Sequence, residues 1–214
     1  MPADESLSRR EFLGRAVKAG ASLAAAGAIA YATHDPAGPG PASVEPQAAA
    51  LPDFSIPGQG KKMCIAHGSD RARTLQLALQ ALGGIETFIQ KGDRVLLKVN
   101  AAFASPPMLC ATTNPQLVSE LARLCYAAGA ATVAVTDNPI NDPASCFALT
   151  GIGQAARSAG ADVILPEERF FKPMTVKGAQ LIRNWPVLMV PLAGVTKLIG
   201  IAPVKDHHLS LIHI

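Results

Sequence analysis

Residues 94–100 read RVLLKVN and decide the fold of this chain. They form a short and mostly aliphatic run, a pattern that predicts a buried β-strand. Residues 115–128 (PQLVSELARLCYAA) predict a helix, because Asn114 suits the N-cap, a proline suits the first helical position and Gly129 follows the end. Residues 132–136 (TVAVT) predict the next strand, so this part of the chain forms a strand–helix–strand unit.

The same alternation continues on both sides of this unit. Apolar strands that alternate with helices are typical of a parallel sheet covered on both faces. We therefore expect an α/β domain over residues 61–208, with a mostly parallel, Rossmann-like sheet, helices on both faces and an incomplete C-terminal edge. The Pro-, Ala- and Gly-rich residues 33–60 predict a linker or extended arm. The expected strands are 62–67, 94–100, 132–136, 162–165, 174–176, 187–190 and 197–203, and the expected helices are 71–90, 115–128 and 143–159, the last broken around 151–153.

Residues 1–32 have the organisation of a secretion signal. Arg9-Arg10 precede Phe12-Leu13, and an uncharged, Ala-rich stretch follows over 19–31. At about 1.5 Å of rise per residue this stretch is too short for a hydrocarbon core about 30 Å thick, so no permanent membrane span is expected. The paired arginines and mild hydrophobicity indicate the twin-arginine export route, with cleavage after Ala32 and a periplasmic or extracellular mature protein. An amphipathic N-terminal helix with two chance arginines is the alternative.

The four cysteines do not form a recognisable metal or cluster motif. Cys64, Cys110, Cys125 and Cys146 include no C-x-x-C pair and match no common zinc or iron–sulfur ligand spacing. Export would allow up to two disulfides among them. Buried free thiols are the favoured interpretation, because Cys is among the most buried residue types.

The composition and the missing motifs exclude several classes of function. The 214 residues carry a formal net charge of +3, dispersed along the chain, and only seven Phe, two Tyr and one Trp are available to stack on bases, so nucleic acid is not an expected partner. The sequence also lacks G-x-G-x-x-G, a phosphate-loop motif and G-x-S-x-G. Dinucleotide, nucleoside-triphosphate and serine-hydrolase functions therefore lack their signatures.

Polar residues at the ends of the predicted strands form the candidate site. Ligands of open α/β sheets bind outside the carboxyl ends of the strands. The hydroxyl pair Thr112-Thr113 is expected there, just before a helix N-terminus, and a helix N-terminus favours an anion. Together with two lysines, these residues predict a crevice for a carboxylate or phosphate. Lys98 would stabilise charge and His207 would act as acid or base. The expected catalytic residues are Lys98 and His207, and the expected ligand-binding residues are Asn100, Thr112, Thr113, Asp137 and Lys205.

Each of these residues also has a structural interpretation. Lys98 can snorkel to the sheet edge, and Thr113 and Asn114 suit any helix start. Asp137-Asn138-Pro139 is a natural turn sequence. His207 and His208 cannot both face one way on a strand, and no metal site is expected.

Several short motifs, in this order and spacing, resemble the domain of unknown function 362 family. The resemblance covers about residues 60–208. It implies a prokaryotic protein and a redox association, because some members carry twin-arginine signals or are fused to ferredoxin-like modules with two iron–sulfur clusters. This chain has no such cysteine-rich segment, so a cluster is expected only through a partner or a missing segment. The motifs are Lys98-x-Asn100, Thr112-Thr113-x-Pro115, Ala127-Ala128-Gly129-Ala130, Val133-Ala134-Val135-Thr136-Asp137 and Pro203-x-Lys205-x-His207.

The last six residues, LSLIHI (209–214), resemble the translation of a transposase adapter used in sequencing libraries. In the family, the Lys-x-His segment is followed by more chain, including a Lys-Asn and glycine-containing stretch. We therefore expect a longer natural protein, with 209–214 as an artefact. Missing C-terminal strands would leave the sheet with an exposed edge.

Three functions fit these observations. The first is an exported, redox-linked enzyme that acts on a small anionic molecule. The second is a non-catalytic extracytoplasmic protein that binds a ligand or metal or assists maturation, and the third is a scaffold for an iron–sulfur partner. The expected partners are the twin-arginine export machinery, the anion and an iron–sulfur redox protein. Fold alone does not choose among these functions.

Overall fold

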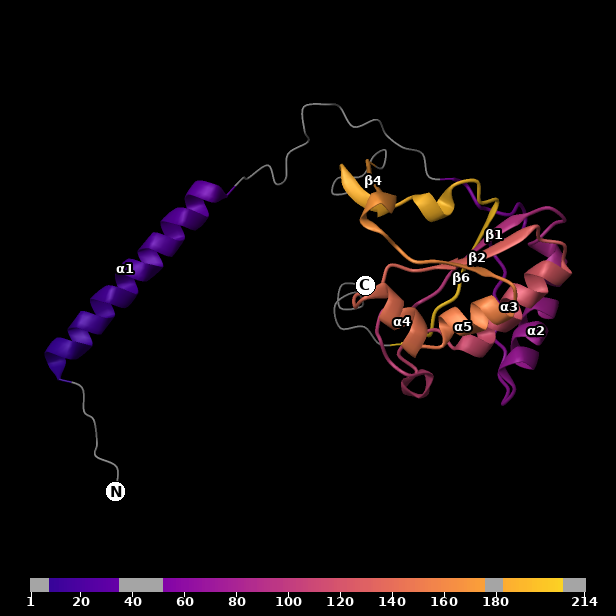
Figure 1. Cartoon of the computed structure of the whole chain (residues 1–214), viewed down its shortest axis with the longest axis horizontal. Helices are drawn as coiled ribbons and strands as arrows, with labels where there is room; N and C mark the ends of the chain where they lie inside the picture. Colours follow the sequence, from indigo (N-terminus) through magenta and orange to yellow (C-terminus); the bar gives the residue numbers. More distant parts are fainter. Residues whose placement is uncertain (1–7, 35–51, 176–182, 206–214) are drawn as a thin grey trace, which may run out of the picture. The chain divides into compact units, whose positions relative to one another are not determined.

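The computed structural model describes residues 8–34, 52–175 and 183–205. The chain divides into two compact units, Met1–Glu45 and Pro46–Ile214. The first contains α1 (Arg9–Thr33) and the second contains the α/β domain (Figure 1). The expected strand residue Val176, most of the expected linker, His207 and the six terminal residues lie outside the described residues.

A four-stranded parallel sheet forms the centre of the second unit. Its strand order is β3-β2-β1-β6, so β1 lies between two parallel neighbours and β6 lies at one edge. In the register, Lys98 at the end of β1 pairs with Thr136 of β2 and with Gly200 of β6. The α/β fold with a parallel sheet flanked by helices is thus confirmed. The strands are β1 (Arg94–Lys98), β2 (Thr132–Thr136), β3 (Asp162–Ile164) and β6 (Lys197–Gly200).

The helices of this unit pack next to one another in the order α2, α3, α5 and α4 (Figure 1). Their bounds are α2 (Arg71–Ala81), α3 (Pro115–Ala127), α4 (Pro143–Leu149) and α5 (Ile152–Ser158). Short 3-10 turns complete the connections: η1 (Ile85–Thr87), η2 (Pro107–Leu109), η3 (Glu168–Phe170) and η4 (Val190–Leu192).

The hydrophobic core lies between this helix layer and the sheet. Val95, Leu97 and Val99 point to the helix side and belong to one buried cluster with Val118 and Leu121 of α3. Leu96, which points to the opposite face, is buried as well, so β1 is covered on both sides. This burial explains the continuous apolar run that the sequence shows at 94–100.

Helix α3 begins and ends where its sequence predicts. The Asn114 side chain accepts a hydrogen bond from the backbone N–H of Gln116 at 2.9 Å, and Pro115 takes the first helical position. At the other end Gly129 has a φ of +96°, and a side chain there would meet the Cα of Lys91 at 3.1 Å. Only glycine fits this combination of left-handed backbone and close approach.

Several predicted elements require correction. Residues 62–67 form no strand: Met63 and Ile65 are 83% and 85% exposed, and no strand of the described residues pairs with this run. The helix expected over 71–90 ends at Ala81, because Gly83 and Gly84 adopt positive φ. The strand expected over 197–203 ends at Gly200, where the paired register with β1 also ends.

A separate two-stranded antiparallel sheet lies between β3 and β6 in sequence. Strand β4 (Phe171–Met174) pairs with β5 (Trp185–Leu188), with Phe171 opposite Leu188. The strands expected at 174–176 and 187–190 are therefore displaced toward the N-terminus by two or three residues. Met174 is nonetheless fully buried, so β4 contributes to the interior of the unit.

The described part of the first unit is α1 with one flanking residue at each end, and none of the α1 residues is buried. Ser8 caps it: the Ser8 hydroxyl accepts from the backbone N–H of Glu11, and the Glu11 carboxylate accepts from the backbone N–H of Ser8. The paired arginines, Arg9 and Arg10, are its first two residues. Among the described residues, no helix is long and apolar enough to cross a membrane.

Leu97 provides a test of the assigned core. Its side chain is fully buried in β1, so Leu97→Ala should lower the free energy of unfolding by about 2–5 kcal/mol, through lost burial and a residual cavity. Leu149→Ala is the matched control, because Leu149 is 57% exposed, and it should change the free energy by less than about 0.5 kcal/mol. Urea unfolding followed by circular dichroism measures both. Equal losses in the two variants would contradict the central position of β1.

Candidate functional site

The parallel register brings the predicted site residues to one edge of the sheet. Lys98 ends β1 and Asp137 directly follows β2, and these two strands pair in register. The chain that leaves β6 passes the same edge, because Ile201 donates its backbone N–H to the Lys98 carbonyl at 2.9 Å. The carboxyl ends of three strands thus meet here, as expected for parallel strands.

A buried carboxylate holds the first two strand ends together. The Lys98 Nζ lies 2.9 Å from one oxygen of Asp137, and the backbone N–H of Ala101 donates to the other oxygen at 2.6 Å. The Asp137 side chain is 5% exposed, whereas the Lys98 side chain is 54% exposed. Asp137 therefore lies inside the fold, whereas more than half of the Lys98 side chain is open to solvent.

Thr113 lies in the loop just before α3 and connects this loop to the chain after β1 and to the chain after β6. Its hydroxyl accepts from the backbone N–H of Asn100 at 2.8 Å and donates to the carbonyl of Ile201 at 2.7 Å. The Thr113 backbone N–H also donates to the Asn100 carbonyl at 2.8 Å. Thr113 is 2% exposed, so its hydroxyl links Asn100 and Ile201 from inside the fold. We call this pair of hydrogen bonds the Thr113 clasp.

Lys205 closes the site from the C-terminal side. Its Nζ donates to the Ala111 carbonyl at 2.7 Å and to the Asn100 side-chain oxygen at 3.3 Å. The same ammonium lies 5.6 Å from the centre of the Phe103 ring, within the range of a cation–π interaction. Lys205 and Asn100 are half-buried, and their contact links the end of β1 to the chain after β6.

The structure thus brings five of the seven predicted side chains into one connected arrangement: Lys98, Asn100, Thr113, Asp137 and Lys205. The sixth, Thr112, is buried beside them at 5% exposure. The seventh, His207, lies outside the described residues. A ligand that approaches from solvent would meet Lys98, Asn100 and Lys205, because the other described members are buried.

Backbone groups complete the arrangement, and sequence reasoning missed them. The Ala101 N–H and the carbonyls of Ala111 and Ile201 satisfy Asp137, Lys205 and Thr113, respectively. Every residue type carries these groups, so no sequence signal marks them. Phe103 was also missed, since a lone aromatic residue in a loop has no distinguishing pattern.

The buried cysteines are unsuited to nucleophilic chemistry. All four cysteines are free; Cys125 and Cys146 are buried as predicted, Cys64 is half-buried, and Cys110 is exposed, contrary to the expectation. Burial raises the pKa of Cys125 to about 12. Burial also raises the pKa of Cys146, and the negative charges of Asp142 and Asp137 add to this effect. Both thiols therefore stay protonated and unreactive near neutral pH.

The described part of the chain contains no group of side chains that forms a ready metal site. Across residues 8–34, 52–175 and 183–205, no three His, Cys, Asp or Glu side chains are grouped so that they could hold a metal ion.

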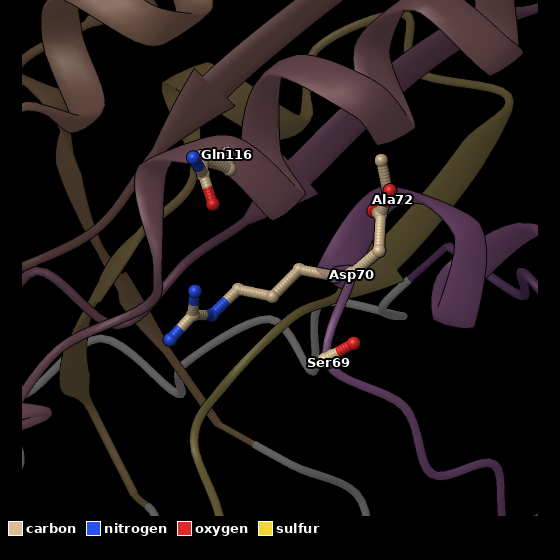
Figure 2. Close-up of a pocket in the computed structure, with 5 residues that line it drawn as sticks. Ser69, Asp70, Ala72 and Gln116 are labelled. Atoms are coloured by element: carbon tan, nitrogen blue, oxygen red, sulfur yellow. The ribbon is translucent and has the colours of Figure 1, made fainter.

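A separate hollow of about 540 Å³ lies at the N-termini of α2 and α3. Figure 2 shows Gln116 of α3 on one side of it and Asp70 and Ala72 of α2 on the other. Both helix starts are already capped: Asp70 accepts from the backbone N–H of Arg73 at 3.0 Å, and Asn114 caps α3. The lining carries one negative charge, at Asp70, and one positive charge, at Arg71, so it has no net positive charge to attract an anion. The hollow therefore does not extend the site at the strand ends.

The fold and site define a class of protein: an α/β domain whose parallel strands bring a lysine, a buried aspartate and a second lysine to their carboxyl edge. Comparison with protein families gives the family itself. The model of the domain of unknown function (DUF362) matches residues 95–212, and the chain belongs to this family. No curated protein and no solved structure matches the chain.

The Thr113 clasp provides a test of how the site is assembled. Thr113→Val keeps the shape of the side chain but leaves the Asn100 N–H and the Ile201 carbonyl without this partner, so the free energy of unfolding should fall by about 1–3 kcal/mol. Thr113→Ser retains the hydroxyl and should lose less than half as much. Urea unfolding of both variants measures the difference. A serine variant as unstable as the valine variant would show that the hydroxyl is not the clasp.

Proposed function

We propose that this is an exported protein whose α/β domain binds a small anionic ligand at the carboxyl ends of β1, β2 and β6. The observation that carries the proposal is the exposure of Lys98 beside a buried Asp137. The carboxylate fixes the position of the ammonium group, while more than half of the lysine side chain remains open to solvent. Such an arrangement preorganises a cation for a ligand.

The charges at the site favour an anion. Lys98 and Lys205 carry two positive charges and Asp137 carries one negative charge, so these three groups leave a net positive charge. Ammonium groups make strong, charge-assisted hydrogen bonds to carboxylate and phosphate oxygens. The amide nitrogen of Asn100 can donate as well, since the Asn100 oxygen is the atom that accepts from Lys205.

Catalysis at this site would use the same groups. Lys98 would stabilise negative charge that develops on the bound molecule, and His207 would supply or accept the proton. A non-catalytic binding or maturation protein would use Lys98, Asn100 and Lys205 alone. The catalytic and the non-catalytic function both require Lys98 to contact the anion, so replacing Lys98 tests both.

Lys98→Ala should weaken anion binding by about tenfold or more, because one charge-assisted hydrogen bond is lost. Isothermal titration with inorganic phosphate and with citrate measures the affinity, and circular dichroism confirms that the variant is folded. Lys172→Ala is the matched control, because Lys172 is an exposed lysine on β4, outside the site. A wild-type protein that binds neither probe, or a Lys98→Ala variant that binds as the wild type does, would contradict the proposal.

The export part of the proposal rests on α1. Its first two residues are Arg9 and Arg10, its remaining charges end at Lys18, and none of its residues is buried. An exposed helix with an uncharged C-terminal half and small residues at Ala30 and Ala32 suits a cleavable signal. We assign it to the twin-arginine route, which delivers the mature protein outside the cytoplasmic membrane.

Arg9→Lys with Arg10→Lys keeps the charge of α1 but removes the arginine pair. Expressed in a bacterium with a twin-arginine pathway, the double variant should remain uncleaved inside the cell, whereas the wild type should appear outside the membrane with Thr33 as its N-terminus. Cell fractionation and N-terminal sequencing measure this. Arg15→Lys, in the same helix, is the control and should be exported normally. Normal export of the double variant would contradict the assigned route.

A further inference from the structure

An apolar cavity of about 310 Å³ lies beside β6. Its walls come from five parts of the chain: the arm before α2, the end of α2, the turn η1 with the residues that follow it, α3 and strand β6 itself. Leu82, Phe88 and Leu198 are among its lining residues, together with Phe54 and Ile56 of the arm. Most of the lining is aliphatic or aromatic, and the cavity therefore suits an apolar occupant.

The arm forms a wall that side-chain packing holds in place. Phe54 and Ile56 are half-buried and line the cavity opposite β6. The backbone hydrogen bonds of these described arm residues are local: Ser55 donates to the Asp53 carboxylate at 2.8 Å, and Gln59 donates to the Ile56 carbonyl at 3.2 Å. A wall held by two apolar side chains can yield to an entering molecule more easily than a hydrogen-bonded strand can.

One charged residue, Lys197, belongs to the lining. It is half-buried, and it takes part in none of the ion pairs found in the described residues. The neighbouring Asp93 carboxylate already accepts the Gln90 backbone N–H at 2.7 Å and the Thr196 hydroxyl at 2.7 Å. Asp93 is also close enough for a longer-range attraction to the Lys197 charge. Because Lys197 forms no ion pair with a described carboxylate, its ammonium can still bind an anionic group in the cavity.

We propose that this cavity binds an anionic amphiphile, with a medium-length alkyl chain among the apolar side chains and the charged group at Lys197. The volume sets the length of the chain. A buried cavity of about 150 Å³ holds benzene, with its six carbon atoms, so about 310 Å³ accommodates roughly twelve non-hydrogen atoms. A ten-carbon carboxylate has this size and the required charge.

This site is distinct from the anion site, although both border β6: the cavity lies along Lys197–Gly200, and the anion site lies at the carboxyl ends of the strands. Lys197 is the first residue of β6 and pairs with Val95, near the start of β1. Lys98 is the last residue of β1, and Asp137 directly follows β2. The two sites therefore share no residue, and each can be tested while the other is left intact.

Titration of the full-length protein with decanoate tests the proposal. We expect a dissociation constant of roughly 10–100 µM, as suits a ligand of about twelve atoms. Decanol, which has the same chain without the charge, should bind about fivefold more weakly, and Lys197→Met should remove this difference. Isothermal titration calorimetry measures all of these affinities.

Leu82→Trp fills the cavity and should reduce decanoate affinity at least tenfold. Leu77→Trp is the matched control, because Leu77 lies on α2, is 47% exposed and is not among the lining residues; it should bind as the wild type does. Ile56→Trp fills the cavity from the arm and provides the same test should the first variant fail to fold.

Three results would overturn the proposal: no binding of decanoate by the wild type up to about 1 mM, decanoate binding that both cavity-filling variants retain, or sedimentation data showing a dimer that Leu82→Trp dissociates without any amphiphile. The last result would assign the cavity to a second copy of the chain.

Discussion

The parallel pairing of β1 with β2 on one side and β6 on the other is the constraint on which the rest of the structure depends. Because Val95, Leu96 and Leu97 are all buried, this strand can lie only in the middle of the sheet. Parallel neighbours then place the ends of all three strands at the same edge. The site follows from this arrangement, since Lys98 and Asp137, which are 39 positions apart in sequence, become neighbours at 2.9 Å.

The hydrogen bonds and the ion pair of buried polar groups fix the positions of the side chains at this edge. Asp137 is inside the fold, and an unpaired carboxylate there would be strongly destabilising. The Ala101 N–H and the Lys98 ammonium compensate its charge, and the Thr113 hydroxyl similarly satisfies both Asn100 and Ile201. The Asp137 carboxylate and the Thr113 hydroxyl are thus fully used inside the protein. Lys98, Asn100 and Lys205 remain as the side chains that can serve a ligand.

The two ends of the sheet offer different chemistry. The carboxyl edge joins two lysines with a buried aspartate, and an anionic group suits it. The start of β6 combines an apolar cavity with a single lysine, which suits a molecule that is both apolar and charged. Membership of the DUF362 family establishes the domain but no activity. The chemistry of the two regions is accordingly the basis of both proposals.

The sequence by itself determined the elements that local pattern controls. Strand 132–136, the start of α3 at Asn114-Pro115 and its end before Gly129 were all predicted, because capping and periodicity act over a few residues. The same local rules placed a strand at 62–67, where the described part of the chain offers no strand to pair with it. They also marked Lys98, Asn100, Thr113, Asp137 and Lys205 as site residues without showing which were buried.

Only the tertiary structure decided how those side chains are used. Thr113 became a clasp and Asp137 an internal counter-charge through contacts with Ile201 and Ala101. The cavity beside β6 likewise joins Phe54 to Leu198, more than a hundred positions away. The partner of a side chain depends on strand order and register. Those are set by burial of the whole core, which no short stretch of sequence encodes.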